Sequence, residues 1–524
     1  MISKPEWFDA FMNPSFYPHP VDKVDLVQTH ISWVFLAGSF VYKIKKPVDF
    51  GFLNFTTLEK RHFYCLEELR LNRRLCPQIY LDVEPVVQLD GGFHLGKEEG
   101  QIVEWCLVMR RMPQHGMMPT LIEQDEISEG DIESVLSKLV TFYKEAATGA
   151  GVNEYGKLDV IVQNTEENFD QTVDFKNKLI SENLYDAIVD YTRSFIAGNR
   201  QLFDRRVEQG FIREGHGDLY SANICFDRAK DDVYIFDCIE FNKRFRCGDV
   251  ASDIAFLAMD LDFHGLADLS FFFVDKFQND YPDNDLAKLL KFYKCYRAYV
   301  RGKIACFTWA DPGIDQETKN KLRQQADDYF RQAALYAGGL PSPTLFVFFG
   351  LSGTGKTTIA LQLAQKKGIA YYNSDKVRKE IIAGIPASEK HLEPFGKGLY
   401  SPEMTQKTYK ALARLAGREL ARGHSVAVDA TFQDEGHRER MVRLARSLGA
   451  KVVFILCKAT DKVVKQRLDK RLSEAQPSDG RWEIYLKQKE RFIEPDTIEG
   501  AKLLKVDTAG PVEDILDNLL ARLK

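Results

Sequence analysis

The sequence lacks several features that would assign it to a special class of protein. No window of the 524 residues approaches the roughly 20 consecutive apolar residues of a membrane helix. The opening stretch MISKPEWFDAFMNP has no basic region followed by an apolar core, so we expect no signal peptide. The nine cysteines include no CxxC pair, which favours buried thiols in a reducing compartment over disulfides or a zinc site. We therefore expect a cytoplasmic protein.

A strong charge of one sign is also missing. The formal net charge is -5, from 71 Lys and Arg against 76 Asp and Glu. This balance argues against broad, non-specific nucleic-acid binding, although a local basic groove would survive the average. We find no internal repeat and no low-complexity segment. A chain of this length is too long for one hydrophobic core and predicts two or three domains.

Two glycines and two prolines mark the clearest boundary. GGLPSP, residues 338–343, separates a polar helical stretch from the apolar strand TLFVFF, as is typical of a linker. We predict a first domain over residues 1–340 and a second over residues 341–524.

The first domain begins with strands and continues with helices. Three strands are expected within 24–48, a helix over 57–76 that Pro77 ends, and two further strands at 80–89 and 102–112. From about residue 128 the pattern is mainly helical, interrupted by a short hairpin (NICF, VYIFD). A small sheet with one helix, followed by a larger helical half, predicts a bilobal α+β domain.

The second domain alternates strands and helices. Strands are expected at 344–350, 369–373, 424–432, 451–457 and 502–508. A helix is expected over DKVRKEIIAG, residues 375–384, and one helix between the last two strands. This order predicts an α/β domain with a parallel sheet and helices on both faces.

A phosphate-binding motif opens the second domain. GLSGTGKT, residues 350–357, matches GxxxxGK[ST] after an apolar strand and before a helix. Its backbone amides can close around phosphate oxygens, Lys356 can reach the outer phosphates, and Thr357 can ligate Mg²⁺. The alternative is a glycine-rich turn with a chance lysine. The predicted nucleotide-binding residues are Gly350, Ser352, Gly353, Thr354, Gly355, Lys356, Thr357 and Thr358.

Acidic residues and an arginine follow two strands of this domain. Asp375 and Arg378 lie one helical turn apart after a strand, where ligands of such sheets bind, so they can handle an acceptor hydroxyl and its anionic group. The alternative is a helix cap with a solvated arginine. Asp429 ends another strand and can hold the magnesium shell through water.

Arg467 and Arg471 share one face of a later helix. They can close over the nucleotide as a lid and stabilise the transferring phosphoryl group, or they can simply form a solvated helix face.

The set GLSGTGKT, SDKVRKE, VDATFQDEGHRER and QRLDKR resembles the small P-loop kinases related to zeta toxins, gluconate kinases and the kinase domain of polynucleotide kinase. The resemblance covers essentially all of residues 344–524. In those relatives the positions that match Asp375 and Arg378 handle the acceptor, which implies phosphorylation of a hydroxyl group. The substrate is not implied, because relatives act on sugars, nucleotide sugars and nucleic-acid ends.

The first domain carries a different phosphotransfer motif. In HGDLYSAN, residues 216–223, Asp218 can orient an attacking hydroxyl and Asn223 can ligate a metal, as in a protein-kinase-like catalytic loop. A second acidic metal ligand should follow on a nearby strand end, and Asp237 is in that place.

A kinase small lobe should also supply a lysine and a glutamate. Lys43 and Lys45 lie on one face of the third strand, and Glu67 and Glu68 lie in the following helix. We favour Lys43 with Glu68, but periodicity leaves the neighbours open. A GxGxxG loop is absent, so the turn at residues 29–32 would have to cover the phosphates.

These motifs resemble the aminoglycoside phosphotransferase superfamily over roughly residues 25–310. The resemblance implies that LVMRRMP is the hinge, where the backbone at Arg110 to Met112 would meet adenine. A degenerate pseudokinase is the alternative. The domain order as a whole resembles a bacterial fusion usually described as a bifunctional aminoglycoside phosphotransferase and ATP-binding protein.

We expect each domain to bind ATP and Mg²⁺ and the chain to phosphorylate hydroxyl groups of small molecules such as sugars, nucleotide sugars or aminoglycoside-like acceptors. Two alternatives remain: a regulatory protein in which one domain senses nucleotide for the other, and a nucleic-acid 5'-hydroxyl kinase, against which the acidic balance counts. A helix with Lys294, Arg297 and Arg301 on one face is either an acceptor surface or an ordinary surface helix. We expect no membrane partner, and the oligomeric state is not indicated.

Overall fold

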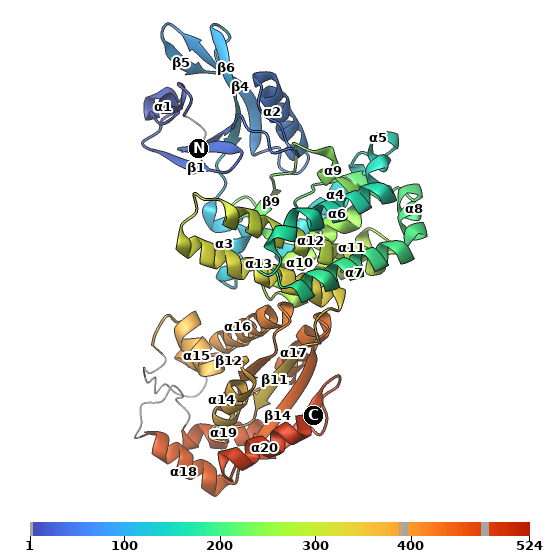
Figure 1. The fold of residues 1–524 in the computed structure, drawn as a ribbon. Coiled ribbons are helices and arrows are strands. Elements are labelled where there is room, and N and C mark those ends of the chain that lie inside the picture. The colour runs from blue at the N-terminus through green and yellow to red at the C-terminus, as the bar shows by residue number, and fades with distance from the viewer. Residues whose placement is uncertain (1–3, 387–388, 390–396, 473–480, 524) are drawn as a thin grey trace. The chain divides into compact units, whose positions relative to one another are not determined.

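The computed structural model describes residues 4–386, 389, 397–472 and 481–523, and Figure 1 labels their elements. The chain divides into two compact units. The first comprises Met1–Glu167, Ile196–Leu257 and Asp275–Tyr293, and the second comprises Asn168–Phe195, Ala258–Val274 and Lys294–Lys524. This division follows contacts, so the domain border between residues 340 and 341 stays a prediction.

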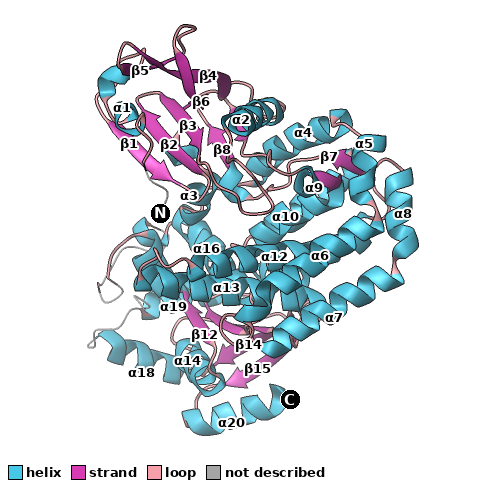
Figure 2. Ribbon diagram, turned by 45° about the horizontal axis from the view of Figure 1, so that its top comes forward, coloured by secondary structure: helices cyan, strands magenta, loops and turns pink. Residues whose placement is uncertain are grey.

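An antiparallel sheet of six strands forms the beginning of the first unit, in the order β1-β2-β3-β6-β4-β5. Its strands are β1 (Val24–Gln28), β2 (Ser32–Ala37), β3 (Phe40–Lys45), β4 (Tyr80–Leu89), β5 (Gly92–Leu95) and β6 (Gln101–Arg110). The helix α2 (Leu58–Asn72) packs on β4 and β6 (Figure 2). It begins where the Thr57 hydroxyl accepts a hydrogen bond from the Lys60 amide, as expected of an N-cap.

Aromatic side chains fill the core of this sheet. The short helix α1 (Phe8–Phe11) and the packing of Trp7 before it on the sheet are not predicted from the sequence. Trp7 meets Trp33 edge to face at 5.4 Å between ring centroids, and Phe8 meets Phe35 at 5.4 Å. These contacts cover β2 with buried aromatic area, which stabilises a small sheet.

Two short strand pairs lie on either side of the catalytic-loop motif. The strand β7 (Ile212–Glu214) pairs with β10 (Cys247–Asp249), and β8 (Ile224–Asp227) pairs with β9 (Asp232–Ile235) as the expected hairpin. HGDLYSAN therefore runs between β7 and β8, and Asp237 follows β9.

Helices make up most of the remainder of residues 118–337. They are α3 (Met118–Glu123), α4 (Glu129–Glu145), α5 (Ala150–Asn153), α6 (Leu158–Thr172), α7 (Glu182–Gly198), α8 (Arg200–Glu208), α9 (Lys243–Arg246), α10 (Val250–Phe263), α11 (Ala267–Asp280), α12 (Leu286–Ala310) and α13 (Gln316–Ala337). The sequence predicted this helical half but not its individual limits. None of the described helices is both long and apolar enough to cross a membrane.

The second unit contains a parallel sheet of five strands in the order β12-β13-β11-β14-β15. The strands are β11 (Thr344–Phe349), β12 (Ala370–Asn373), β13 (Val426–Asp429), β14 (Lys451–Lys458) and β15 (Lys502–Asp507). Its helices are α14 (Lys356–Lys367), α15 (Ser374–Lys376), α16 (Pro402–Ala421), α17 (Glu435–Ser447), α18 (Asp461–Leu472), α19 (Trp482–Arg491) and α20 (Val512–Leu523).

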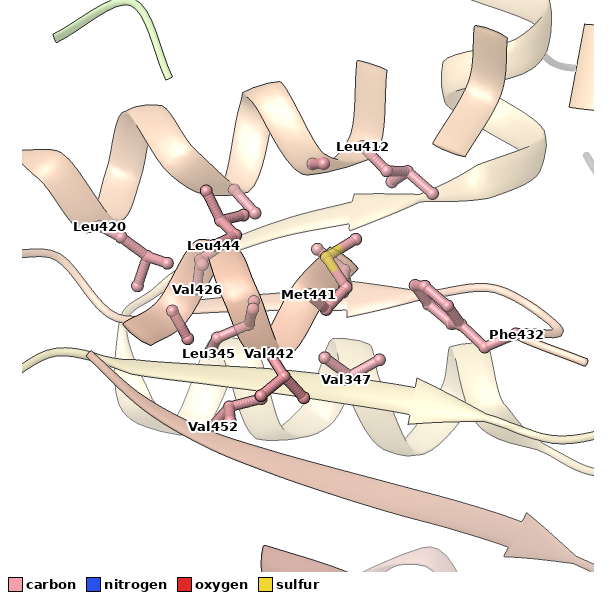
Figure 3. Packing of buried hydrophobic residues seen from close by; sticks show 14 of the residues in the cluster. Leu345, Val347, Leu412, Leu420, Val426, Phe432, Met441, Val442, Leu444 and Val452 are labelled. Atoms are coloured by element: carbon pink, nitrogen blue, oxygen red, sulfur yellow. The ribbon is translucent and has the colours of Figure 1, made fainter. Parts of the chain in front are cut away.

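Both faces of this sheet are buried, which explains why β11 is a continuous apolar run. Leu345 and Val347 point to one face, where they pack with Leu412 of α16 and Met441 of α17 (Figure 3). Phe346, between them, belongs to the core on the other face with side chains of α14 and α20. Parallel sheets with helices on both faces have this pattern.

Two local predictions need correction. DKVRKEIIAG was expected as an ordinary helix, but α15 continues as a π-helix over Val377–Ile382. One helix is expected between β14 and β15, whereas the described residues of that segment form two, α18 and α19. The expected fold class is confirmed: an α+β region with a small antiparallel sheet and a helical half is followed by an α/β region with a P-loop and a parallel sheet.

Candidate active sites

The catalytic-loop motif brings Asp218 and Asn223 together. The Asn223 side-chain amide donates to the Asp218 carbonyl oxygen at 2.9 Å and to its carboxylate Oδ2 at 3.0 Å. Gly217, just before, has a φ of 84°, and a Cβ there would lie 2.6 Å from the Phe245 carbonyl oxygen. Glycine is therefore required at this turn by both conformation and space.

Asp253 braces the same loop. It lies in α10, and its carboxylate accepts the backbone amides of His216 at 2.8 Å and Gly217 at 3.1 Å, together with the Tyr143 hydroxyl at 3.0 Å. A buried acid that accepts three such bonds fixes the backbone next to Asp218.

His216 is a structural residue of the loop. Its Nδ1 accepts the Asp218 amide at 3.2 Å, and its Nε2 lies 3.0 Å from the Phe236 carbonyl oxygen, to which it must donate. Burial lowers the pKa of His216 to about 4, so the ring is neutral near pH 7. A neutral ring with both nitrogens bonded within the protein is poorly suited to carry a proton to substrate.

The lysines of β3, the glutamate of α2 and two acidic residues after β9 form one network of ion pairs. Lys43 Nζ lies 2.7 Å from Glu68 Oε1 and 3.1 Å from Asp237 Oδ1. Lys45 Nζ lies 2.7 Å from Glu68 Oε2 and also contacts Glu240. The structure thus pairs Lys43 with Glu68, and it shows why the sequence left Lys45 open: Glu68 binds both lysines.

Burial and neighbouring charges shift the pKa values within this network in opposite directions. Burial alone would raise the pKa of Glu68, but Lys43 and Lys45 lower it to about 2. Burial raises the pKa of Glu240 in spite of the attraction of Lys45. Burial alone would lower the pKa of Lys43, but Asp237 and Glu68 raise it well above the ordinary range. Lys43 therefore stays charged at the point where it meets Asp237.

Asp237 adopts an unusual backbone conformation. Its φ is 62°, in the left-handed region that aspartate tolerates better than most residues, and its amide donates to the Tyr80 hydroxyl at 3.3 Å. Strain of this kind gathers at functional sites. Asp237 and Asn223 carry the oxygen ligands that Mg²⁺ prefers, so these two residues could hold a metal.

The predicted hinge follows β6. The Arg110 amide donates to the Ile79 carbonyl oxygen at 2.8 Å, and the Arg111 amide donates to that of Ser39 at 2.9 Å. Within the described part of the chain, the Met112 backbone makes no backbone hydrogen bond. Met112 is therefore the better placed of the two predicted hinge residues to present its backbone to a ligand.

In the turn between β1 and β2, the Thr29 hydroxyl accepts the amides of Ile31 at 3.3 Å and Ser32 at 2.9 Å. A turn bonded in this way can approach phosphates through its backbone, although this role stays a prediction.

The P-loop joins β11 to α14 in the second unit. Lys356 Nζ and the Thr354 hydroxyl each donate to the Leu351 carbonyl oxygen at 2.8 Å, and the Ser352 amide donates to Gln488 Oε1 at 2.9 Å. Thr357 and Thr358 lie in the first turn of α14. The other predicted loop residues, Gly350, Gly353 and Gly355, all have positive φ values.

Asp429 lies beside this loop with partners that the sequence did not single out. Its Oδ1 accepts the Asn373 side-chain amide at 2.5 Å, and its Oδ2 accepts the Tyr371 hydroxyl at 2.7 Å. The Asn373 amide is also 3.4 Å from Thr357 Oγ1. Burial raises the pKa of Asp429. The predicted metal residues Thr357 and Asp429 thus come together through Asn373, because β12 and β13 pair Asn373 with Asp429.

Asp375 and Arg378 form an ion pair at the same edge of the sheet. Arg378 Nη1 lies 3.0 Å from Asp375 Oδ1, and the guanidinium stands 4.6 Å from the centre of the Tyr400 ring. The Asp375 amide donates to Asn373 Oδ1 at 3.0 Å. The helix cap is therefore Asn373, and the Asp375 carboxylate is paired with Arg378 and does not serve as the cap.

Arg467 is connected to the P-loop by hydrogen bonds through Thr508. Its guanidinium donates to the Thr508 hydroxyl at 3.1 Å and to the Thr508 carbonyl oxygen at 2.6 Å. The Thr508 hydroxyl in turn lies 2.7 Å from the Thr354 carbonyl oxygen. The lid role of Arg467 stays a prediction. Arg471 lies in the last turn of α18, and its side chain is outside the described residues.

The structure also gives the surroundings of the cysteines and of the basic helix face. All nine cysteines are buried free thiols, as predicted. Among the described residues, no group of three His, Cys, Asp or Glu side chains forms a metal cage. On the basic helix face, Lys294 Nζ lies 2.7 Å from Asp262 Oδ2, and Arg297 is buried. These two residues therefore do not form an open basic surface.

Comparison with known proteins adds to this geometry. A family described as an AAA domain matches residues 345–495. Among solved structures, a choline/ethanolamine kinase family protein from Mesorhizobium loti is 12% identical, with a TM-score of 0.37, over 61% of this chain and 93% of its own. A sugar kinase from Janibacter sp. is 21% identical, with a TM-score of 0.25, over 35% of this chain and 95% of its own.

A further comparison covers nearly the whole chain. An uncharacterized protein of Mycobacterium tuberculosis is 30% identical in an alignment 503 residues long, which covers 94% of this chain and 95% of that protein. The similarity therefore spans both the region that contains HGDLYSAN and the P-loop region. On this evidence the chain belongs to the same family as the mycobacterial protein.

Proposed function

We propose that the protein is a phosphotransferase with two kinase sites, each of which uses ATP and Mg²⁺ to phosphorylate a hydroxyl group of a small molecule. Sugars, nucleotide sugars and aminoglycoside-like compounds are the acceptor classes to test first. The observation that carries the proposal is the position of Lys43, which contacts both Glu68 and Asp237. Three segments that are far apart in the sequence thereby place a cation where phosphate oxygens and a metal would meet.

In the first site, Asp218 would orient the acceptor hydroxyl and take its proton. Asn223 and Asp237 would hold Mg²⁺, which would neutralise the charge that develops on the phosphate oxygens. Lys43 would bind those oxygens, Glu68 would hold Lys43, and the hinge backbone at Arg110 to Met112 would bind adenine.

In the second site, Gly350–Thr358 would enclose the phosphates, with Lys356 on the outer phosphates and Thr357 and Asp429 around the metal. Asp375 would take the proton of the acceptor hydroxyl, and Arg378 would bind an anionic group of the acceptor. Arg467 and Arg471 would stabilise the transferring group.

Two substitutions in the full chain test the proposal. Labelled ATP and a pool of hydroxylated metabolites are supplied to Asp218→Ala and Lys356→Ala, and each variant should lose one of two sets of phosphorylated products. Asp204→Ala, on the exposed side of α8, and Lys366→Ala, at an exposed ion pair of α14, are the matched controls. Loss of all products in Lys356→Ala alone would mean that the first site is not a working kinase. Phosphorylated oligonucleotide ends would instead favour a nucleic-acid kinase.

A further inference from the structure

Arg246, at the end of α9, connects three segments that carry or adjoin proposed catalytic and metal-binding residues of the first site. It is only 3% exposed. Its Nε lies 3.1 Å from Glu214 Oε1, its Nη2 lies 3.2 Å from Glu67 Oε2, and its Nη1 donates to the Glu240 carbonyl oxygen at 3.0 Å. One guanidinium thus binds α2, the end of β7 and the segment that follows Asp237.

Arg70 closes these contacts into a ring. Its Nε lies 2.9 Å from Glu67 Oε1, and its Nη2 lies 3.0 Å from Glu214 Oε1. We call Glu67, Arg246, Glu214 and Arg70 the four-residue ring. Positive and negative groups alternate around it, so each carboxylate binds two guanidinium groups of the ring, and Glu214 also pairs with Arg74 outside the ring at 3.5 Å. Although burial alone would raise the pKa of Glu214, Arg70 and Arg74 help to lower it to about 2, so its carboxylate stays charged near neutral pH.

Each contact of the ring is close in sequence to a residue of the proposed site. Glu67 directly precedes Glu68, and Glu214 stands four residues before Asp218. The Glu240 carbonyl that Arg246 binds lies three residues after Asp237. A displacement of the ring would therefore move the helix, the loop or the metal-binding segment relative to the other two.

We propose that the four-residue ring positions α2 so that Lys43 can reach Glu68 and Asp237 together. Arg246 is the member of the ring that also binds the segment after Asp237. The inference rests on the proposed function of the first site and adds positioning residues to it. None of the four residues need touch substrate. They act through the Lys43–Glu68 pair and through the backbone that leads to Asp218.

Geometry favours positioning over a contribution to stability alone. Buried ion pairs often add little net stability compared with apolar residues, but they select one arrangement of the parts that they join. The planar guanidinium of Arg246 uses three nitrogens on three segments, and a lysine could not reproduce this fork. Misplacement of a catalytic group by about 1 Å can cost on the order of 10²-fold in rate.

The test uses Glu67→Gln in the full chain, with Lys356→Ala as background to silence the second site. Glu67 is partly exposed, so the variant should fold, and its neutral amide keeps the shape while it weakens both guanidinium contacts. We expect the turnover number for Asp218-dependent hydrolysis of Mg-ATP to fall on the order of 10-fold or more, with a melting temperature close to that of the background. Glu59→Gln, the same change on the exposed first turn of α2, should leave both quantities unchanged.

A second measurement separates positioning from a merely structural role. Affinity for Mg-ATP is compared in Glu67→Gln, Lys43→Met and the double variant. If the ring acts through Lys43, the double variant should bind no more weakly than Lys43→Met alone, whereas independent effects would multiply. Multiplied effects, or a Glu67→Gln chain that equals Glu59→Gln in turnover and affinity, would overturn the inference.

Failure of the proposed function gives a different result. If the Lys356→Ala chain shows no Asp218-dependent hydrolysis, the first site is not a kinase under these conditions. The ring is then judged by Mg-ATP affinity alone. Weaker binding in Glu67→Gln than in Glu59→Gln would support it, and equal binding would exclude it.

Discussion

The side-chain amide nitrogen of Asn223 donates to Asp218 at two places, the carbonyl oxygen at 2.9 Å and the carboxylate at 3.0 Å. The proposed proton acceptor and a proposed metal ligand are therefore held by one amide group. Because the amide nitrogen is only a donor, Oδ1 is the atom of this group that could ligate a metal. The two residues cannot reorient independently.

Asn223→Ala removes both bonds to Asp218 and the amide oxygen at once. We expect turnover at the first site to fall on the order of 10²-fold and the Mg²⁺ concentration for half-maximal rate to rise. The measurement is Mg-ATP hydrolysis in the Lys356→Ala background at several Mg²⁺ concentrations. Asn320→Ala, on an exposed position of α13, is the control. A lower turnover with an unchanged Mg²⁺ requirement would remove Asn223 from the metal site.

Two adjacent tyrosines of β12 give a matched test of the second site. The Tyr371 hydroxyl donates to Asp429, whose pKa burial already raises, while the Tyr372 hydroxyl donates to Glu419 at 3.0 Å. Tyr371→Phe removes a bond that favours the ionised carboxylate, so the pKa of Asp429 should rise further. The acid limb of the pH–rate profile of the second site should then move to higher pH. Tyr372→Phe should leave that limb in place, and equal shifts in the two variants would contradict the role of Asp429.

The candidate site residues that can be predicted from the sequence are those grouped in short motifs. GLSGTGKT and HGDLYSAN each supply several residues within eight positions, so no tertiary information is needed to group them. Asp237 was found because a second metal ligand was required near a following strand end. The parallel sheet followed from alternating strands and helices.

Residues that join distant segments could not be predicted in this way. Tyr371 contacts Asp429 only because β12 and β13 pair in one register, and Arg246 joins segments that lie up to 179 residues apart. Lys43 and Lys45 have the same strand face and a shared partner in Glu68, so periodicity could not separate them. Asn373, the last residue of β12, is not among the predicted site residues, although its place before Ser374 is a recognisable cap position.

Gly355 tests how tightly the P-loop is enclosed. Its φ is 86°, and a Cβ there would lie 3.1 Å from the Thr508 hydroxyl and 3.2 Å from Arg467 Nη1. Gly368, at the other end of α14, has a φ of 62° with nothing within 4 Å of a Cβ. Both alanine variants should lose about 1 kcal/mol of stability from the left-handed backbone. Only Gly355→Ala should also weaken Mg-ATP binding to the second site, measured with Lys43→Met to reduce binding at the first. Equal affinities would mean that the loop adjusts freely.

The buried His216 predicts a dependence of stability on pH. Its pKa is lowered to about 4 in the folded chain, below the value near 6.5 of an unfolded histidine. Because the unfolded state binds the proton more readily, stability is fully present above about pH 6.5 and is lost as the pH falls toward about 4, by on the order of 3 kcal/mol. Urea unfolding of the wild type and of His216→Gln between pH 7 and 4 measures this share. The variant should be less stable at pH 7 and should lose less on acidification. Parallel curves would show that His216 does not carry the effect.

Lys43 and Lys45 should differ in what their loss costs, although both bind Glu68. The Lys43 side chain is 16% exposed and meets Asp237, whereas the Lys45 side chain is 1% exposed and lies between Glu68 and Glu240. Lys43→Met should therefore abolish turnover at the first site with a small change in stability. Lys45→Met should leave the Glu240 carboxylate buried without its lysine and cost about 3–5 kcal/mol of the free energy of unfolding.

The double variant Lys45→Met/Glu240→Met separates charge from packing. It removes both members of the buried pair and keeps much of their volume, so most of the stability lost in Lys45→Met should return. Glu68 would keep Lys43 as its partner, and turnover should then recover with the fold. If stability returns but turnover does not, Lys45 belongs to the catalytic arrangement as well as to the core, and the two lysines would have to be treated as one nucleotide-binding unit.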